Sequence, residues 1–434
     1  MNTLIKFSLL YSGAASSLRL LGVIVSLWVA TSLPQDSYAD WGLLYSVQTG
    51  VISFSLVGIV ESVVGLLNSY DKDSQRVQLY AAAVSVFRWT GLVTAFLVVI
   101  FYFLYLNPHS AGLVALLSVV ISGLLLAYSG LQSQIVRLKE DHLSSLFFAF
   151  FVPLSGLIGS AVTFNIFGSV NSFFCGSAIG LAIILLLFRN QFANRHPFLP
   201  QNTIHLQLFS RLAPFIIVTF LGWLSGYGNN FLVQRFFGPV EVAKFTFALT
   251  VSSIPQLVSA SLNQVWAPRF YKLTHCYPFD EVESRNIIFY NLQCILLGLL
   301  GAVSIIVFPH LLSAIGGNLL SYLSMRYEIC LLFVAYILLA PWTHAYNYLL
   351  AYDKGRHVMN IVIATSAIGI LLWLLLMLML GPMGIYVGFL SQMFLRSAGI
   401  YIYSRRFWPL RVGWLGLIVG STLPLSALWA TRGF

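Results

Sequence analysis

The chain has 434 residues, of which 59% are hydrophobic and only 8% are charged. Soluble globular proteins carry roughly 25% charged residues, so this composition excludes a soluble globular protein and predicts a polytopic membrane protein. The formal net charge of +10 comes from basic residues scattered singly between apolar runs, and such scatter does not indicate a nucleic-acid partner.

Many apolar runs of the chain are long enough to cross a membrane as helices. A bilayer core of about 30 Å needs roughly 20 apolar residues per helix. Charge and turn clusters mark off twelve such runs, at about 10–33, 41–67, 80–106, 111–136, 143–166, 169–188, 209–236, 241–266, 286–309, 326–351, 357–380 and 383–404. A thirteenth segment, about 413–430, contains Pro424, and whether it crosses the membrane stays open. The pattern predicts an all-α fold.

Basic residues favour one side of this topology. If the N-terminus is cytoplasmic, fifteen Lys and Arg residues fall on the cytoplasmic side, and only Arg235, Arg326 and Arg432 fall outside. Cytoplasmic loops of membrane proteins carry such an excess. We therefore predict a multi-pass protein with a cytoplasmic N-terminus. Because Arg19 interrupts the first apolar stretch, we expect no cleaved signal peptide.

Two short turns resemble each other across the chain. Leu33–Asp36, between the first two predicted helices, is similar to Gly238–Glu241, between the seventh and eighth, at an offset of about 205 residues. Repeats in transporters place the substrate site at the interface between the two halves. Unless the likeness is a coincidence, the chain forms two six-helix lobes around a central cavity: 1–188 and 209–404, joined by a cytoplasmic linker at 189–208 and followed by an additional membrane segment at 405–434.

Polar residues follow one face of each predicted helix in the hairpin 209–272. The helical spacing places them together in two stripes: Gly222, Ser225, Gly226, Asn229 and Asn230 on the first helix, and Ser252, Gln256, Ser259 and Asn263 on the second. Amides and hydroxyls gain nothing from facing acyl chains, so both stripes should face protein or a watery cavity. Interhelical hydrogen bonding and a substrate-binding cavity wall are both open interpretations.

Two arginines lie too deep in apolar runs to be interfacial. Only residues 20–33 would remain if Arg19 marked the start of the first helix, which is too few to cross, and the same argument applies to Arg396. An arginine at such a depth normally faces a bundle interior or an aqueous cavity. Arg19 and Arg396 are therefore candidates for binding an anionic substrate.

Glu61 and Arg88 are weaker candidates, because each could lie at the cytoplasmic boundary with its charge in the headgroups. Arg88 would add a third positive charge to the cytoplasmic half of the membrane. Glu61 is the only acidic residue predicted inside a span, so we expect it to pair with Arg19 or Arg88, or to take part in ion coupling.

The sequence contains no recognisable catalytic or metal-binding motif. Its four cysteines are far apart, and there is no P-loop, no H-E-x-x-H and no cluster of metal ligands. His344, near Asn347, is either a proton site or a hydrogen-bonded core histidine. We therefore expect neither an enzyme nor a resident cofactor or metal.

Both predicted hairpins resemble a known family. The phrases SLPQDSYADWGLL and LGWLSGYGNNFLVQRFFGPVEVAKF are similar to the first and the seventh-to-eighth helix turns of the Wzx-type polysaccharide-transport flippases of the multidrug/oligosaccharidyl-lipid/polysaccharide (MOP) exporter superfamily. The helix count agrees across about residues 1–404. Where that family often has an aspartate near the end of helix 7, this chain has Asn229 and Asn230, which puts a proton-binding role there in doubt.

The resemblance implies a flippase of the bacterial inner membrane. Its substrate would be a polyprenyl-diphosphate-linked oligosaccharide, an O-antigen or capsule repeat unit, moved to the outer leaflet by alternating access and driven by a proton or sodium gradient. Arginine suits the diphosphate and amides suit the sugars, which assigns binding roles to Arg19, Arg88, Arg396, Asn229, Asn230 and Asn263. Partners would be membrane lipids and the polymerase and chain-length proteins of the same pathway.

Two other functions remain open. A cation-coupled multidrug exporter of the same superfamily would need acidic residues in its cavity, and this sequence offers one at most. A membrane-embedded polysaccharide polymerase or ligase would generally carry a large outer loop, whereas the outer turns predicted here are short.

Overall fold

The computed structural model describes residues 2–67, 73–103, 112–139, 141–189, 202–352 and 355–431. All regular elements among these residues are helical, so the predicted fold class is confirmed. Among these residues ten helices are long and apolar enough to cross a membrane, and the bent pair 204–210 and 215–224 makes an eleventh if it crosses as one span. The first predicted span corresponds to the helix α1 (Asn2–Ser32).

Contacts divide the chain into two compact units that interleave along the sequence. Unit 1 contains Met1–Val25 and Asp36–Leu232, and unit 2 contains Ser26–Gln35 and Val233–Phe434. The predicted lobes instead divide the chain at 189–208. The predicted lobes follow from a repeat in the sequence, whereas the units follow from contacts between residues, so the units do not test the lobes. The division into two six-helix lobes stays a prediction.

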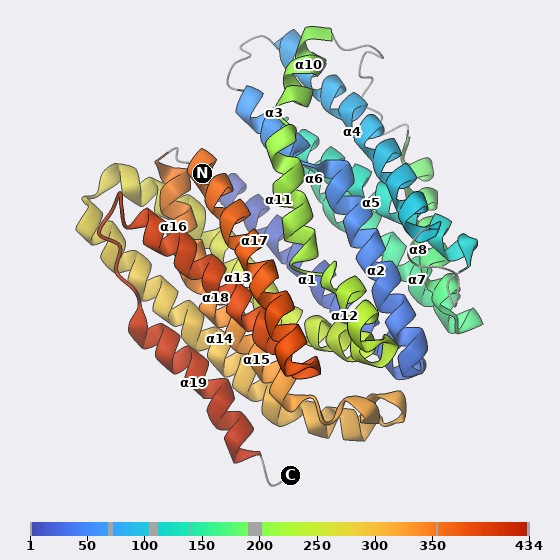
Figure 1. Cartoon of the computed structure of the whole chain (residues 1–434). Helices are drawn as coiled ribbons and strands as arrows, with labels where there is room; N and C mark the ends of the chain where they lie inside the picture. Colours follow the sequence, from blue (N-terminus) through green and yellow to red (C-terminus); the bar gives the residue numbers. More distant parts are fainter. Residues whose placement is uncertain are drawn as a thin grey trace. The chain divides into compact units, whose positions relative to one another are not determined.

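Unit 1 is a bundle in which α5 packs against α8, and α7 packs along α8 (Figure 1). Its elements after α1 are α2 (Gln35–Leu56), α3 (Ile59–Leu67), α4 (Asp73–Phe101), α5 (Leu113–Leu138), α6 (His142–Leu146), the π-helix η2 (Phe147–Phe151), α7 (Val152–Phe167), α8 (Val170–Leu187), α10 (Asn202–Ser210), α11 (Ala213–Leu224) and the first four residues of α12 (Asn229–Phe237). Apolar side chains of α3, α4, α5 and α10 form one buried core cluster.

Two predicted helices of unit 1 are broken. The run 41–67 divides at Gly58, whose φ of 68° favours glycine, and a Cβ there would collide with the Phe215 ring. The run 209–236 divides into α11 and α12 at a turn over residues 225–228. α10 begins inside the predicted linker and meets α11 at a bend of 46°. Hydropathy alone marks none of these breaks, because the runs stay apolar throughout.

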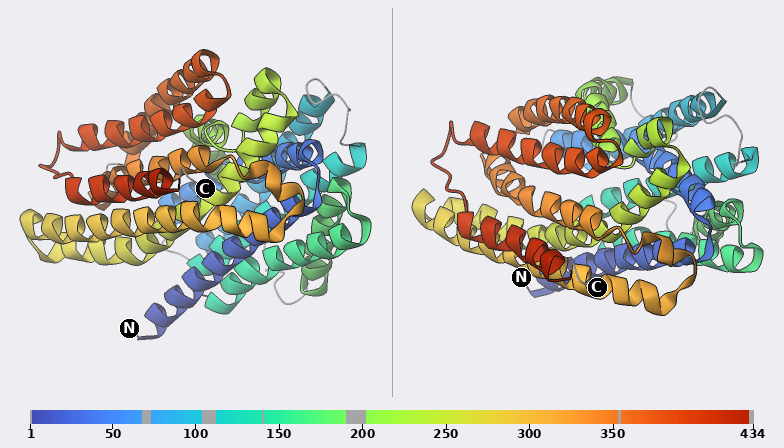
Figure 2. Two further views of the ribbon diagram at one scale, coloured as in Figure 1. Left: turned by 90° about the horizontal axis from the view of Figure 1, so that it is seen from below. Right: turned by 60° about the horizontal axis from the view of Figure 1, so that its bottom comes forward.

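Unit 2 consists of long helices that pack lengthwise (Figure 2). They are α13 (Pro239–Cys276), α14 (Phe279–Ile315), the 3-10 helix η3 (Gly317–Tyr322), α15 (Arg326–Leu338), α16 (Ala340–Ala351), α17 (Gly355–Leu380), α18 (Pro382–Ser404) and α19 (Trp414–Ala430). The predicted run 326–351 divides between α15 and α16 next to Pro341, since proline lacks an N–H and crowds the preceding turn. α13 and α14 extend well beyond their predicted ends at 266 and 286.

The thirteenth predicted segment is the helix α19, which lies along α14 in all views (Figures 1 and 2). The two backbones meet at Gly298 and Gly420, where a Cβ on either residue would collide with the backbone of the other helix. Small residues allow such close helix contacts in membrane proteins. The contact fixes α19 against α14 despite Pro424 within it.

Candidate functional site

Arg396 lies in a half-buried aromatic setting in unit 2. It is on α18, and its guanidinium carbon is 5.1 Å from the centre of the Trp342 ring on α16. Trp342 stacks on Tyr346, one turn later on the same face, with 4.5 Å between ring centres and 16° between ring planes. A cation over an indole face is attracted by the ring quadrupole, so the pair holds the guanidinium without a counter-ion.

Two hydrogen-bond donors at this place have no acceptor. The Nε atom of Arg396 and the Nε1 atom of Trp342 are buried, and neither has a partner among the residues that the structure describes. The ion pairs formed by those residues do not include Arg396 either. Buried donors are nearly always bonded, and each one left unpaired costs about 1–3 kcal/mol. The two orphan donors and one cation form a site suited to an acceptor-rich anion; we call Arg396, Trp342 and Tyr346 the arginine site.

The other predicted charged residues lie in unit 1. Arg19 on α1, Glu61 on α3 and Arg88 on α4 are all exposed. The ion pairs between described residues do not include Glu61. Its predicted pairing or coupling role, and the substrate-binding roles of Arg19 and Arg88, stay predictions.

Asn229 and Asn230 are fully buried in unit 1. The Asn230 amide donates to the Ser46 hydroxyl on α2 at 2.9 Å, and Trp223 on α11 donates to the Ser46 carbonyl at 3.0 Å. Asn229 donates to the Ser225 carbonyl at 3.4 Å. These bonds attach α11 and α12 to α2, as the interhelical interpretation requires. A role in binding substrate stays a prediction for both.

The polar stripe of α13 is also used between helices. Asn263 accepts a 2.9 Å hydrogen bond from Asn347 on α16, and Ser259 accepts one of 2.6 Å from Gln293 on α14. Asn263 thus contacts α16, the helix that carries Trp342. The expectation that the stripe faces protein rather than lipid agrees with these bonds.

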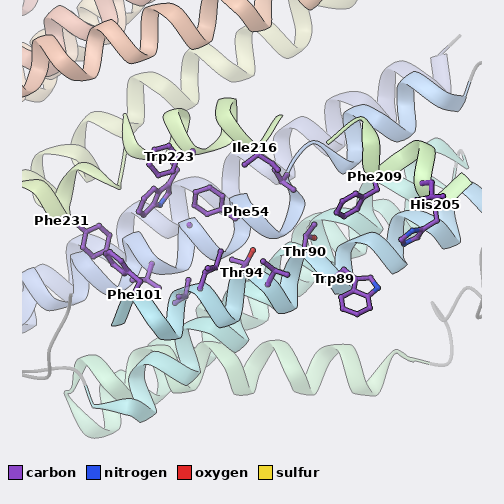
Figure 3. Close-up of a pocket in the computed structure, with 18 residues that line it drawn as sticks. Phe54, Trp89, Thr90, Thr94, Phe101, His205, Phe209, Ile216, Trp223 and Phe231 are labelled. Carbon is purple, nitrogen blue, oxygen red and sulfur yellow. The ribbon is translucent and has the colours of Figure 1, made fainter. Parts of the chain in front are cut away.

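A long apolar groove crosses unit 1 (Figure 3). It has a volume of about 970 Å³ and is lined by side chains of α2, α4, α10, α11 and α12. Its lining on α4 runs from Trp89 to Phe101, which is about 18 Å along the helix axis. Figure 3 shows His205 and Phe209 at one end and Phe101 and Phe231 at the other.

The groove is open on one side and almost free of polar groups. Trp89, Leu97 and Phe209 are each more than half exposed, and aromatic pairs such as Phe101 with Phe231, 5.2 Å apart, close its far end. His205 is the one titratable residue among the lining side chains. The sequence did not reveal the groove, because apolar residues that line a groove and those that face lipid have the same pattern.

A buried acidic residue was missed as well. Glu283 on α14 and His344 on α16 are 1% and 3% exposed, and the carboxylate Oε2 is 3.2 Å from the imidazole Nε2. The prediction that Glu61 is the only acidic residue inside a span stays a prediction, although α14 begins at Phe279 and carries Glu283 in the same helix as an apolar run. The run 280–285 is rich in charge, which placed the predicted helix start after it.

The fold places the chain in a class. It is similar to a multidrug resistance MATE family transporter of the MOP superfamily in an inward-facing conformation, with a TM-score of 0.70, 12% identity and coverage of 97% of this chain and 99% of that one. Lipid II flippase MurJ, in an inward closed conformation, gives a TM-score of 0.64, 12% identity and coverage of 96% and 98%. A point mutant of the Vibrio cholerae MATE transporter VcmN gives a TM-score of 0.62 and 13% identity, with coverage of 95% of this chain and 98% of that one. The chain has the fold of a MOP-superfamily transporter.

The family follows from the sequence. Residues 5–274 match the model of the polysaccharide biosynthesis protein family, and because this is more than half of the chain, the chain belongs to that family. The resemblance to polysaccharide-transport members of the MOP superfamily is confirmed. A search of curated proteins finds no match to this sequence.

Proposed function

We propose that the chain is a flippase that moves a polyprenyl-diphosphate-linked oligosaccharide from the cytoplasmic to the outer leaflet of the bacterial inner membrane by alternating access, with its N-terminus in the cytoplasm. The observation that carries this proposal is the arginine site. A diphosphate offers several acceptor oxygens and negative charge, which match the cation and the two orphan donors of Arg396 and Trp342. The exposed face of an aromatic pair also suits the apolar face of a sugar ring.

The groove of unit 1 supports the lipid part of the proposal. Its apolar lining and length of about 18 Å suit an extended hydrocarbon chain better than a compact polar solute. Arg88 directly precedes Trp89 at the His205 end, which places a cation beside the groove's polar end. In this proposal the groove holds the isoprenoid tail, and the diphosphate-binding roles of Arg88 and Arg19 stay predictions.

The arginine site argues against export of cationic drugs. A cation would meet the guanidinium of Arg396, and like charges without screening repel strongly. The buried carboxylate of Glu283 is surrounded by donors and offers such a cation little. Export of cationic drugs is therefore the alternative function that the experiment below must distinguish from flipping.

The test uses the purified chain in phosphatidylcholine–phosphatidylglycerol liposomes with a fluorescent polyprenyl diphosphate disaccharide. Arg396→Ala removes the charge and the orphan donor, and since hydrogen bonds to charged groups contribute about 1.5–3 kcal/mol, we expect flipping to fall by about 10- to 100-fold. The matched control is Arg406→Ala, because Arg406 also stacks on an aromatic ring, Tyr403, at 5.4 Å, but is exposed.

Two results would overturn the proposed function. One is flipping by a folded Arg396→Ala protein at the wild-type rate. The other is transport of a cationic dye by the wild-type protein, with no flipping of the lipid-linked disaccharide. Arg19→Ala and Arg88→Ala, measured in the same assay, show whether unit 1 contributes to holding the diphosphate.

A further inference from the structure

Glu283 is held by donors from three directions. The imidazole Nε2 of His344 is 3.2 Å from Oε2, and the Tyr348 hydroxyl donates to the same oxygen at 2.7 Å. The backbone N–H of Arg411 donates to Oε1 at 2.7 Å. A carboxylate with this many donors is ionised, because hydrogen bonds donated to the charged form stabilise it.

The position of His344 defines where a proton can be added. Its Nε2 faces a carboxylate oxygen that is already ionised, so Nε2 carries a hydrogen and donates it. A further proton then binds at Nδ1 and makes an imidazolium. Without it, the buried pair of Glu283 and His344 has a net charge of −1; with it, the pair is neutral. Burial disfavours an uncompensated charge, and the neutral state of this pair is the one that holds the added proton.

Among the described residues, the ion pairs that involve Glu283 or His344 are limited to the one between them. Tyr290 packs edge-on against the His344 ring at 5.6 Å, and the centres of the Tyr348 and His344 rings are 5.7 Å apart. Arg411 and Asp280 are charged residues of the surrounding segments, and their exposed side chains pair with each other at 3.6 Å. The titratable and charged groups facing the pair from the surrounding elements are Asp280, Tyr290, Tyr348, Tyr401 and Arg411.

The pair also controls a connection between helices. Arg411 belongs to the irregular segment 405–413, which joins α18 to α19. Its N–H is bonded to Glu283, and the neighbouring Leu410 carbonyl accepts a 2.8 Å bond from Tyr401. Glu283 therefore ties α14 and α16 to this segment.

We propose that Glu283 and His344 form the binding site of a proton that drives transport. A proton is favoured over sodium, because a hard cation needs several oxygen acceptors, whereas the carboxylate here is surrounded by N–H and O–H donors. Binding at His344 Nδ1 changes the charge beneath the segment 405–413 and so changes how firmly this segment is held. The inference rests on the proposed transport function.

The test is the steady-state distribution of the fluorescent polyprenyl diphosphate disaccharide between the leaflets of liposomes. With one proton coupled to each substrate molecule, a gradient of one pH unit supports up to about a tenfold difference between leaflets. We expect this shift for the wild type under a pH gradient and none under a sodium gradient. In His344→Asn the distribution should return to equal, and thermal unfolding in detergent shows whether the variant is folded.

A matched control is His357→Asn. His357 is bonded to the Tyr403 hydroxyl at 2.6 Å in the same unit but is half-buried, and no carboxylate contacts it among the described residues. This variant should keep the full pH-driven shift. A shift that persists in His344→Asn, or a wild-type shift that follows sodium, would overturn the proton site.

A second measurement does not depend on the substrate. Titration of the detergent-solubilised protein between pH 5 and 9 should show one proton fewer taken up by His344→Asn than by the wild type. If His344→Asn fails to fold, His344→Gln replaces it. Equal uptake by the variant and the wild type overturns the site, whereas absence of flipping by the wild type overturns only the proposed function.

Discussion

Glu283 and Arg396 are both charged residues inside unit 2, yet their surroundings differ in one respect. The carboxylate of Glu283 has its acceptor capacity filled by three donors of the protein. The guanidinium of Arg396 has an aromatic ring beside it and a buried Nε without an acceptor. A charge satisfied by its own protein stabilises the fold, and a charge left unsatisfied is available to a ligand. Their environments therefore distinguish a stabilising role for Glu283 from a ligand-binding role for Arg396, a distinction that composition alone does not reveal.

The largest expected effect is on stability at Glu283. Glu283→Ala leaves the buried Tyr348 hydroxyl and the Arg411 amide without their acceptor, and breaking a buried pair costs about 3–5 kcal/mol. Thermal or denaturant unfolding in detergent measures this loss. The control is Glu281→Ala on the same helix, where the exposed pair with Arg285 contributes at most about 1 kcal/mol. Equal losses of stability in Glu283→Ala and Glu281→Ala would show that the buried bonds of Glu283 do not stabilise the fold, which contradicts the contrast drawn with Arg396.

Arg396→Met should change stability in the opposite direction. The substitution keeps an apolar stem against Trp342 and removes an unpaired donor, so we expect the free energy of unfolding to stay level or rise by about 1–3 kcal/mol. Flipping should be lost at the same time. A strong loss of stability would show that Arg396 belongs with Glu283, as a residue satisfied by its own protein.

The smallest expected effect tests an uncharged residue. Asn230→Ala removes the bond to Ser46 that attaches α12 to α2, and a single hydrogen bond contributes about 0.5–1.5 kcal/mol. We expect a stability loss of this size in the same unfolding assay. Loss of flipping without any loss of stability would instead support the predicted binding role of Asn230.

Composition and span length predicted the features that depend on the bilayer. The low charge content predicted a helical membrane protein, and the length argument singled out Arg396, which carries one orphan donor and lies beside that of Trp342. Both arguments work because the hydrocarbon core imposes one length and one penalty on every segment.

The sequence failed where neighbouring helices decide the outcome. Glu283 was missed because a carboxylate at a helix end looks the same whether it faces solvent or three donors. The break at Gly58 was missed because it depends on the Phe215 ring packed against it. The partners of Asn230 and Asn263 were missed because a helical stripe shows which side faces inward but not which helix it meets.

The contact between Gly298 and Gly420 has a practical consequence for following the transport cycle. No side chain separates the two backbones, so α19 cannot slide or rotate on α14 without steric overlap. We expect α14 and α19 to move together as one rigid body. A spin label at Thr422, which is exposed on α19, would therefore report the movement of α14 without altering any residue of α14 itself.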